Sequence, residues 1–351
     1  MKQRNIGLDF LRIFSMLGII SLHIIGCGGM AEAAEGTQNI VFINMVSAIS
    51  YCSVNVFAML SGYLYVEKEN IKMQNIISLI FIVLFYSACI TIFFIIVYPY
   101  HYNGLYSYLF SLFPPVVGRY WYITSYVLMF ILIPYINTFV CSISKNDLKK
   151  LIIVLFILLS IIPTFGLYDY FRILGGYSPW WLIFCYIIGA YAKLYLDKFV
   201  TKKICLLIFC GNIVLVTSIR SIFEGHFTYI FNQYTSPFMV INSFFILLFF
   251  SQIKVVAKEK CKRVIVSISN AAFSVYIIHS HIMVYDYIIK DSFMFAEEQG
   301  IIGFVGIYIF SLFGIYIVCY LIDFIRKIFF KCFMFDKLSI YLGNKFDKLL
   351  F

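Results

Sequence analysis

Three ionisable residues, Asp9, Arg12 and His23, stand in an apolar run near the N-terminus. Asp9 and Arg12 are three positions apart, so their side chains can pair on one face of a helix. Arg12 and His23 are eleven positions apart, which returns them to the same face after three turns, about 16 Å apart along the axis. Charged groups are costly inside a bilayer, and this set is therefore a candidate functional site.

The geometry of this set suits an elongated ligand that enters from the cytoplasmic side. Its anionic head would lie near Arg12, and its reactive end would reach His23. A coenzyme A thioester has this form, because a phosphorylated nucleotide carries a long thin arm that ends in the thioester. Histidine is well suited to general-base work near neutral pH. In the structural alternative, Arg12 extends to the membrane interface and His23 is a hydrogen-bonded residue of a helix bundle.

The composition indicates what kind of fold holds these residues. Of 351 residues, 62% are hydrophobic and 13% are charged, whereas soluble domains carry about 25% charged residues. This excludes a cytosolic enzyme, a disordered chain and a secreted disulfide scaffold. The ten cysteines include no Cys-x-x-Cys pair, and we interpret them as buried small hydrophobes.

We predict an all-α polytopic membrane protein with about ten transmembrane helices, since a span needs about 20 apolar residues. The apolar stretches cover residues 7–28, 40–65, 75–98, 120–140, 151–168, 177–196, 204–222, 236–253, 267–289 and 301–323. The fifth and eighth are short, and three serines and an asparagine interrupt the ninth. Residues 105–118 resemble a re-entrant or interfacial segment because they contain Pro114 and Pro115.

The charge pattern orients the chain. With the N-terminus in the cytoplasm, the segments on that side carry most of the 27 Lys and Arg residues, as the positive-inside rule requires. The outer segments carry only Arg119, Arg172, Arg220 and Lys290. We therefore expect both termini in the cytoplasm and a multi-pass protein of the cytoplasmic membrane. The net charge of +10 then needs no nucleic-acid partner.

Two regions are expected along the chain. Residues 1–323 form the transmembrane domain, and residues 324–351 form a basic, aromatic cytoplasmic tail that suits the surface of an anionic lipid leaflet. Lys2 and Arg4 before an apolar run also resemble a signal peptide. The ionisable residues within that run favour a retained helix instead.

Four short motifs resemble the acyltransferase-3 family of membrane O-acyltransferases. The run from Gly7 to Arg12 followed by His23 has the family's Arg-x10-His arrangement, and Val56–Leu64 resembles its aromatic-rich end of the second helix. Tyr120-Trp121-Tyr122 before Pro134 resembles a Trp-Tyr helix opening, and Ala272–His279 resembles a late Phe-Ser-x-Tyr segment. The four occur in the expected order over essentially the whole chain.

The resemblance implies transfer of an acyl group, usually acetyl, from cytoplasmic acetyl-CoA to a hydroxyl of an envelope glycan or of its lipid-linked precursor. Arg12 and His23 carry over as the functional pair, and Tyr276 and His279 as motif positions. Some family members carry a fused extracytoplasmic domain that completes the transfer. This chain shows none, so it transfers directly or through a separate extracytoplasmic partner.

Further residues are candidates for binding. Ser61, Gly62 and Tyr63 lie at the cytoplasmic end of the second helix and could contact the coenzyme A arm, with Asp9 orienting Arg12; plain helix packing is the alternative. Arg119 beside Trp121 could contact an anionic glycan or a pyrophosphate, or could be an interfacial anchor. Glu32 and Glu35 could assist His23, although solvated loop charges are the simpler interpretation.

Two other function classes deserve comparison with the enzyme. His279 and His281 could suggest a metal, but residues two apart on a helix point about 200° from each other, so we predict no metal site. A transporter or a flippase of lipid-linked glycan is the alternative to an enzyme. Carriers often show inverted repeats, whereas we find no repeat and the ionisable residues cluster in the first helix.

Overall fold

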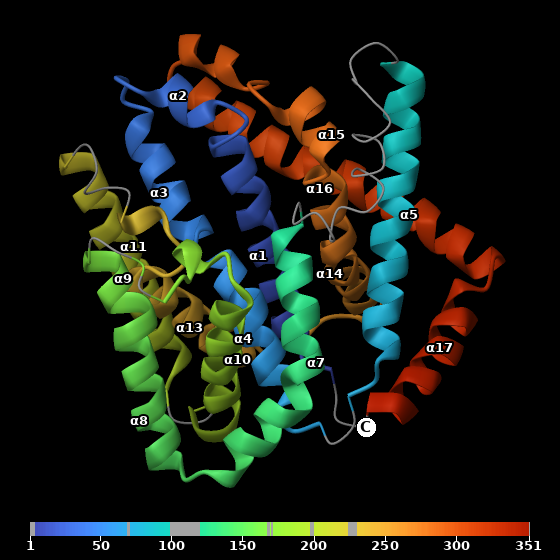
Figure 1. Cartoon of the computed structure of the whole chain (residues 1–351). Helices are drawn as coiled ribbons and strands as arrows, with labels where there is room; N and C mark the ends of the chain where they lie inside the picture. Colours follow the sequence, from blue (N-terminus) through green and yellow to red (C-terminus); the bar gives the residue numbers. More distant parts are fainter. Residues whose placement is uncertain are drawn as a thin grey trace.

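A computed structural model describes residues 4–68, 71–98, 120–166, 169, 171–196, 200–223 and 230–350, with side chains up to Lys348. The described residues form helices and contain no strand. Nine helical segments within them are long and apolar enough to cross a membrane, and a tenth, shorter apolar helix covers Pro237–Ser251. The predicted all-α polytopic fold is therefore confirmed (Figure 1).

The first half of the chain begins with the helix that carries Arg12 and His23. Its helices are α1 (Ile6–Ile25), α2 (Met30–Ala34), α3 (Ile40–Ser50), α4 (Ser53–Tyr65), α5 (Gln74–Val97), α7 (Trp121–Ser142), α8 (Lys145–Phe156), η1 (Ile157–Ile161) and α9 (Ile162–Phe165). The predicted helix over 40–65 is divided at Tyr51 and Cys52 into α3 and α4. The predicted segment over 105–118 lies outside the described residues.

The second half completes the bundle. Its elements are η2 (Leu174–Gly176), α10 (Pro179–Tyr191), η3 (Ala192–Leu196), α11 (Lys202–Ile222), η4 (Ile230–Asn232), α13 (Pro237–Ser251), α14 (Glu259–His279), α15 (Ile282–Val284), η5 (Tyr285–Ile289), η6 (Met294–Glu298), α16 (Ile301–Cys332) and α17 (Phe335–Leu350). The helix predicted to end at 323 continues to Cys332, and α17 packs along the start of α5.

The bounds predicted for the ninth helix, 267–289, are wrong. The helix α14 begins at Glu259 and ends at His279, and the chain then turns before α15 and η5. The polar residues that are predicted to interrupt this helix lie inside it. Their side chains are tolerated there because they have hydrogen-bond partners. Ser269 donates a hydrogen bond to Asp9 of α1, and the hydroxyls of Ser267 and Tyr320 bond to each other.

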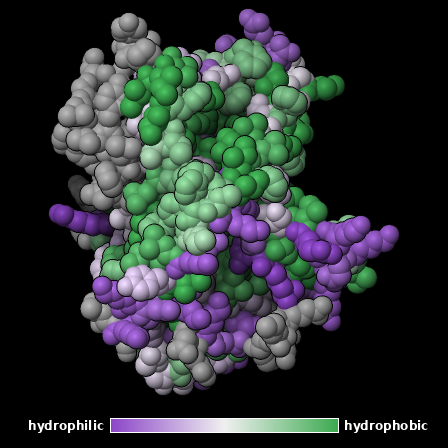
Figure 2. Space-filling view, turned by 90° about the vertical axis from the view of Figure 1, so that its right-hand side faces the viewer, coloured by the Kyte–Doolittle hydropathy of each residue, from purple (hydrophilic) through white to green (hydrophobic). Residues whose placement is uncertain are grey.

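One end of the bundle, the lower end in Figure 1, is rich in lysine, and we call it the basic end. Lys68 follows α4, Lys145 begins α8, and Lys193 lies in η3. On the side of the molecule in Figure 2, hydrophilic residues gather in the lower half and apolar residues cover most of the upper half. The positive-inside rule predicts that the basic end faces the cytoplasm.

The helices α10 and α13 begin halfway along the bundle rather than at its upper end. The indole Nε1 of Trp181, at the start of α10, donates to the Oδ1 of Asn55 (2.8 Å), and Asn55 lies near the break between α3 and α4. The Nδ2 of Asn55 donates to the carbonyl of Tyr234 (2.8 Å), just before α13. These bonds hold the loop before α13 near the centre of the bundle, where it contributes to the candidate site.

Candidate functional site

A buried ionic cluster forms around Asp9 in the first turn of α1. Asp9 is 1% exposed and accepts two hydrogen bonds from the guanidinium of Arg4, at 2.8 and 2.6 Å. The Nη1 of Arg12 bonds to it at 3.0 Å, and the hydroxyl of Ser269 donates to it at 2.9 Å. The Arg4 guanidinium also bonds to Asn270 (3.0 Å), and its hydrogen bond with Asp9 raises the pKa of Arg4. Two cations thus share one carboxylate, and the cluster keeps a net positive charge.

Arg12 lines a cavity of about 300 Å³ near the basic end. The cavity walls come from α1, α4, α5, α7 and α14 and include Ser61, Tyr65, Asn75 and Tyr126. Burial and the nearby charge of Arg12 lower the pKa of Lys68. An arginine has five N–H donors, of which Asp9 takes one. The cavity therefore offers positive charge and free donors to an anionic ligand.

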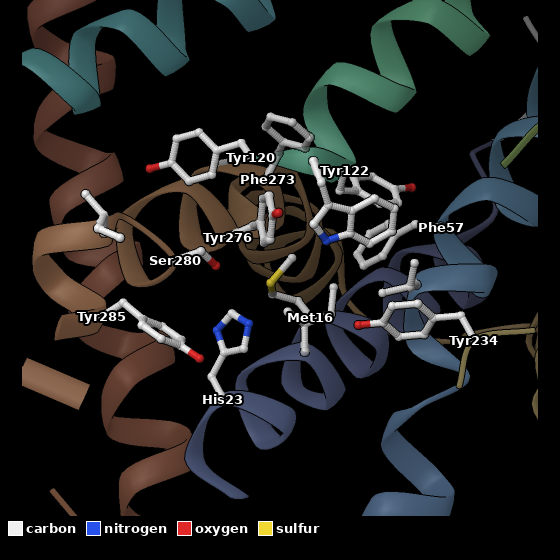
Figure 3. A pocket seen from close by; sticks show the side chains of 14 residues that line it. Met16, His23, Phe57, Tyr120, Tyr122, Tyr234, Phe273, Tyr276, Ser280 and Tyr285 are labelled. Atoms are coloured by element: carbon white, nitrogen blue, oxygen red, sulfur yellow. The ribbon is translucent and has the colours of Figure 1, made fainter. Parts of the chain in front are cut away.

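His23 lines a second cavity of about 280 Å³, farther from the basic end. Its remaining walls are mostly aromatic, and Figure 3 shows Tyr276 and Tyr285 beside the histidine and Tyr234 across the cavity. The hydroxyl of Tyr120 donates to the carbonyl of Ile277 (2.7 Å), which fixes the start of α7 against the end of α14. Such a pocket excludes water while leaving polar groups at chosen points.

The two cavities are neighbours that share three aromatic walls. Phe57, Tyr122 and Phe273 line both of them. Along α1, Arg12 faces the first cavity, whereas Met16, Ile19 and His23 face the second. The spacing of four, three and four positions is that of a single helix face. A thin ligand that passed between these aromatic side chains would contact Arg12 at one end and His23 at the other.

His23 packs against residues from the far end of the sequence. Its ring centroid lies 4.9 Å from that of His279 and 5.6 Å from that of Tyr285. His279 Nδ1 bonds to the carbonyl of Val275, so this nitrogen carries the proton in the neutral ring and Nε2 is an acceptor. Among the described residues, neither His23 Nδ1 nor His279 Nε2 has a hydrogen-bond partner. The two imidazoles are thus close together, and each keeps one buried nitrogen without a partner among the described residues.

A cluster of three packed aromatic rings borders the His23 cavity. Trp121 lies 4.6 Å from Tyr177 and 5.9 Å from Tyr234, measured between ring centroids. Tyr177 and Tyr234 in turn are 5.1 Å apart. Trp121 and Tyr234 line the cavity, while Tyr177 is exposed. Flat, amphipathic faces of this kind suit the stacking of a sugar ring, with polar tips available to its hydroxyls.

The structure places the other predicted residues in two groups. Ser61 lines the Arg12 cavity, and Tyr276 lines the His23 cavity. Gly62 instead meets the backbone of Tyr186, so its missing side chain lets α4 and α10 approach closely. The ring of Tyr63 lies under the ammonium of Lys193 (4.9 Å), also on the α10–η3 side.

The remaining predicted residues lie away from the cavities or outside the described chain. Glu32 and Glu35 are exposed on and after α2, and they do not line the His23 cavity. Arg119 lies outside the described residues. His281 caps α15, because its Nδ1 accepts a hydrogen bond from the backbone amide of Met283. The described part of the chain contains no group of His, Cys, Asp or Glu side chains arranged to hold a metal ion.

Some important residues were not identified from the sequence. Tyr285 and Tyr234 line the His23 cavity, but tyrosine is too common in this chain to stand out. Asp323 is completely buried in α16, where Arg326, Lys327 and the hydroxyl of Tyr86 bond to it. Its spacing to Arg326 repeats that of Asp9 to Arg12, but the predicted boundary between the last helix and the tail falls between the two residues.

The fold and site define a class of protein: a multi-pass helical membrane protein with a histidine in an aromatic cavity beside a cationic one. The chain matches the family model described as Acyltransferase domain over residues 5–324, and it belongs to the acyltransferase-3 family. It is therefore a membrane acyltransferase. No match was found among curated proteins or among solved structures.

Proposed function

We propose that this protein is an O-acetyltransferase of the cytoplasmic membrane. It moves an acetyl group from cytoplasmic acetyl-CoA to a hydroxyl of a cell-surface polysaccharide or of its lipid-linked precursor. The observation that carries this proposal is the pair of cavities that share Phe57, Tyr122 and Phe273, with Arg12 on one side and His23 on the other.

The Arg12 cavity suits the donor. Arg4 and Arg12 outnumber Asp9 in charge, and Lys68 adds a further positive charge near them. Phosphate and pyrophosphate groups are favoured at such a site, and an arginine binds them with several donors at once. Ser61 lies in the same cavity and can contact the arm of the donor. The thioester would then reach the aromatic walls that lead to His23.

The His23 cavity suits the transfer itself. The acceptor oxygen attacks the thioester carbonyl carbon while His23 removes its proton, and the carbon–sulfur bond breaks. The histidine then returns the proton to the departing sulfur, so it ends in its starting state. Proton transfer by a well-placed side chain accelerates a reaction by about 10²–10⁴-fold. Trp121 and Tyr234 would hold the acceptor sugar by stacking.

The decisive test uses purified protein with radiolabelled acetyl-CoA and a glycan acceptor. We expect label to appear on the glycan, with equimolar release of free coenzyme A. Uptake of intact glycan or acetyl-CoA into proteoliposomes without transfer would favour a carrier instead. Comparing the glycan of cells that lack or contain the protein, by mass and by NMR, identifies the sugar and the hydroxyl.

A further inference from the structure

A third, apolar cavity of about 660 Å³ lies between α5, the segment from His279 to Ile289, and α16. We call it the lateral groove. Phe93 of α5, Ile288 of η5, and Phe310 and Val318 of α16 line it, and each of the four is more than half exposed. Such side chains on a membrane helix face lipid, so the lateral groove is accessible from within the bilayer.

The lateral groove reaches the candidate site through His279. This histidine is 1% exposed, lines the lateral groove, and packs its ring against His23 at 4.9 Å. Its Nε2 has no hydrogen-bond partner among the described residues. A buried, unpartnered nitrogen is unusual in an apolar wall, because each such group costs free energy unless a ligand completes it.

The short segment after His279 separates the lateral groove from the His23 cavity. Ile282 and Tyr285 face the cavity, whereas Val284 and Ile288 face the lateral groove. The π-helical turn η5 lies in this segment, and such turns occur frequently at functional sites. A molecule in the lateral groove would therefore have its polar end within one thin wall of His23.

The shape and lining of the lateral groove fit a hydrocarbon chain. On α16 it runs from Phe310 to Arg326, about 24 Å at the rise of a helix. This exceeds half the thickness of a bilayer core, about 15 Å. Toward the basic end it stops at Arg326, which is ion-paired with Asp323. The end farthest from Arg326 lies beside Phe94 and Phe293, near the backbone of Gly28 that follows α1.

We propose that the lateral groove binds the hydrocarbon chain of the lipid carrier to which the acceptor glycan is attached. This deepens the proposed function and rests on it. A free polysaccharide has no use for an apolar groove beside the catalytic histidine, whereas a lipid-linked glycan needs its chain in the membrane and its hydroxyl at His23. The acceptor would enter sideways from the bilayer, opposite to the donor, which enters near Arg12.

Two glycines of α16 provide a matched pair of variants. A Cβ atom added at either Gly314 or Gly306 meets no atom within 4 Å, so neither substitution begins with a backbone clash. Gly314 lines the lateral groove and Gly306 does not. Gly314→Trp should fill the lateral groove, and Gly306→Trp controls for a bulky residue on the same helix.

The first measurement compares two acceptors, a polyprenyl-linked glycan and the same glycan in water-soluble form. Gly314→Trp should raise KM for the polyprenyl-linked acceptor about tenfold, equivalent to about 1.4 kcal/mol. It should leave KM for the soluble acceptor unchanged, and Gly306→Trp should change neither. An equal effect on both acceptors, or no effect on either, overturns the proposal.

The second measurement does not depend on catalysis. A photoreactive polyprenyl phosphate, added to the protein in lipid nanodiscs, should label residues of the lateral groove in wild type and several-fold less in Gly314→Trp. Labelling that is equally strong with photoreactive phosphatidylglycerol would identify a general lipid site and overturn the proposal. If wild type transfers acetyl to neither acceptor, the proposed function fails, and this labelling still decides what the lateral groove binds.

Discussion

The imidazole rings of His23 and His279 pack against each other with their centroids 4.9 Å apart, although α1 and α14 lie at opposite ends of the sequence. His279 is held by the carbonyl of Val275, and it presents its acceptor nitrogen to the interior. The contact fixes one face of the His23 ring. We therefore expect His279 to position His23 and to face the lateral groove.

Replacing His279 tests this positioning role. His279→Ala should lower kcat about tenfold, less than the loss of a general base, because His23 keeps its chemistry but loses its orientation. His279→Phe retains a flat ring against His23, and it should restore part of that rate. Steady-state kinetics of the two variants give the comparison. Equal activity of the Ala and Phe variants would contradict a role through ring packing.

The donor site is tested at Arg12. Arg12→Gln should raise KM for acetyl-CoA about tenfold with a smaller change in kcat, because the guanidinium contacts the donor away from the reacting bond. Arg263, exposed on α14, provides the control of equal charge. Arg263→Gln should leave both constants unchanged. If Arg12→Gln lowers kcat and leaves KM for acetyl-CoA unchanged, the role of Arg12 in donor binding is contradicted.

The acceptor site is tested at two tryptophans, one that lines the cavity and one that is exposed. Trp121 lines the His23 cavity, whereas Trp180 is 61% exposed at the start of α10. Trp121→Ala should weaken acceptor binding by about 1–2 kcal/mol, raising its KM several-fold, and should leave KM for acetyl-CoA unchanged. Trp180→Ala should affect neither substrate. An increase in the donor KM alone would contradict the assignment of Trp121 to the acceptor.

The packing of α4 against α10 predicts an effect on stability. An added side chain at Gly62 would overlap the backbone of Tyr186, so Gly62→Ala should destabilise the protein by about 1–3 kcal/mol. Gly211 of α11 meets no atom within 4 Å of an added Cβ. Gly211→Ala should stabilise by up to about 1 kcal/mol, since alanine favours a helix over glycine. Thermal unfolding in detergent checks both, and equal melting temperatures for the two variants would contradict this packing.

The local sequence pattern was enough to predict the helices and the face of α1 that Arg12 and His23 share. Apolar runs of membrane length identified the spans, and the 3.6-residue repeat predicted a shared face for Arg12 and His23. The same reasoning misplaced the bounds of α14, which begins at Glu259 and ends at His279. It also treated Ser267 and Ser269 as interruptions of the helix. Their partners, Tyr320 and Asp9, come from other helices, and no local pattern carries that information.

Sequence periodicity could not predict the partners of the site residues either, because those partners come from distant parts of the chain. Tyr285 and Tyr234 line the cavity of His23 only because α15–η5 and the loop before α13 return to the centre of the bundle. The Arg4 contribution to the Asp9 cluster depends on a residue before the helix turning back onto it. The predicted boundary at residue 323 separates Asp323 from Arg326, although their spacing of three is that of a paired, buried set.

The central claim is that Arg12 binds the donor while His23 performs the chemistry. The most direct measurement is the acetyl-CoA affinity and the single-turnover transfer rate of purified His23→Ala, with His281→Asn as the control that keeps a helix-capping side chain. We expect His23→Ala to keep its Kd for acetyl-CoA within about twofold of the wild-type value. Its single-turnover transfer rate should fall by at least about 10²-fold. Transfer at the wild-type rate in His23→Ala would contradict the central claim.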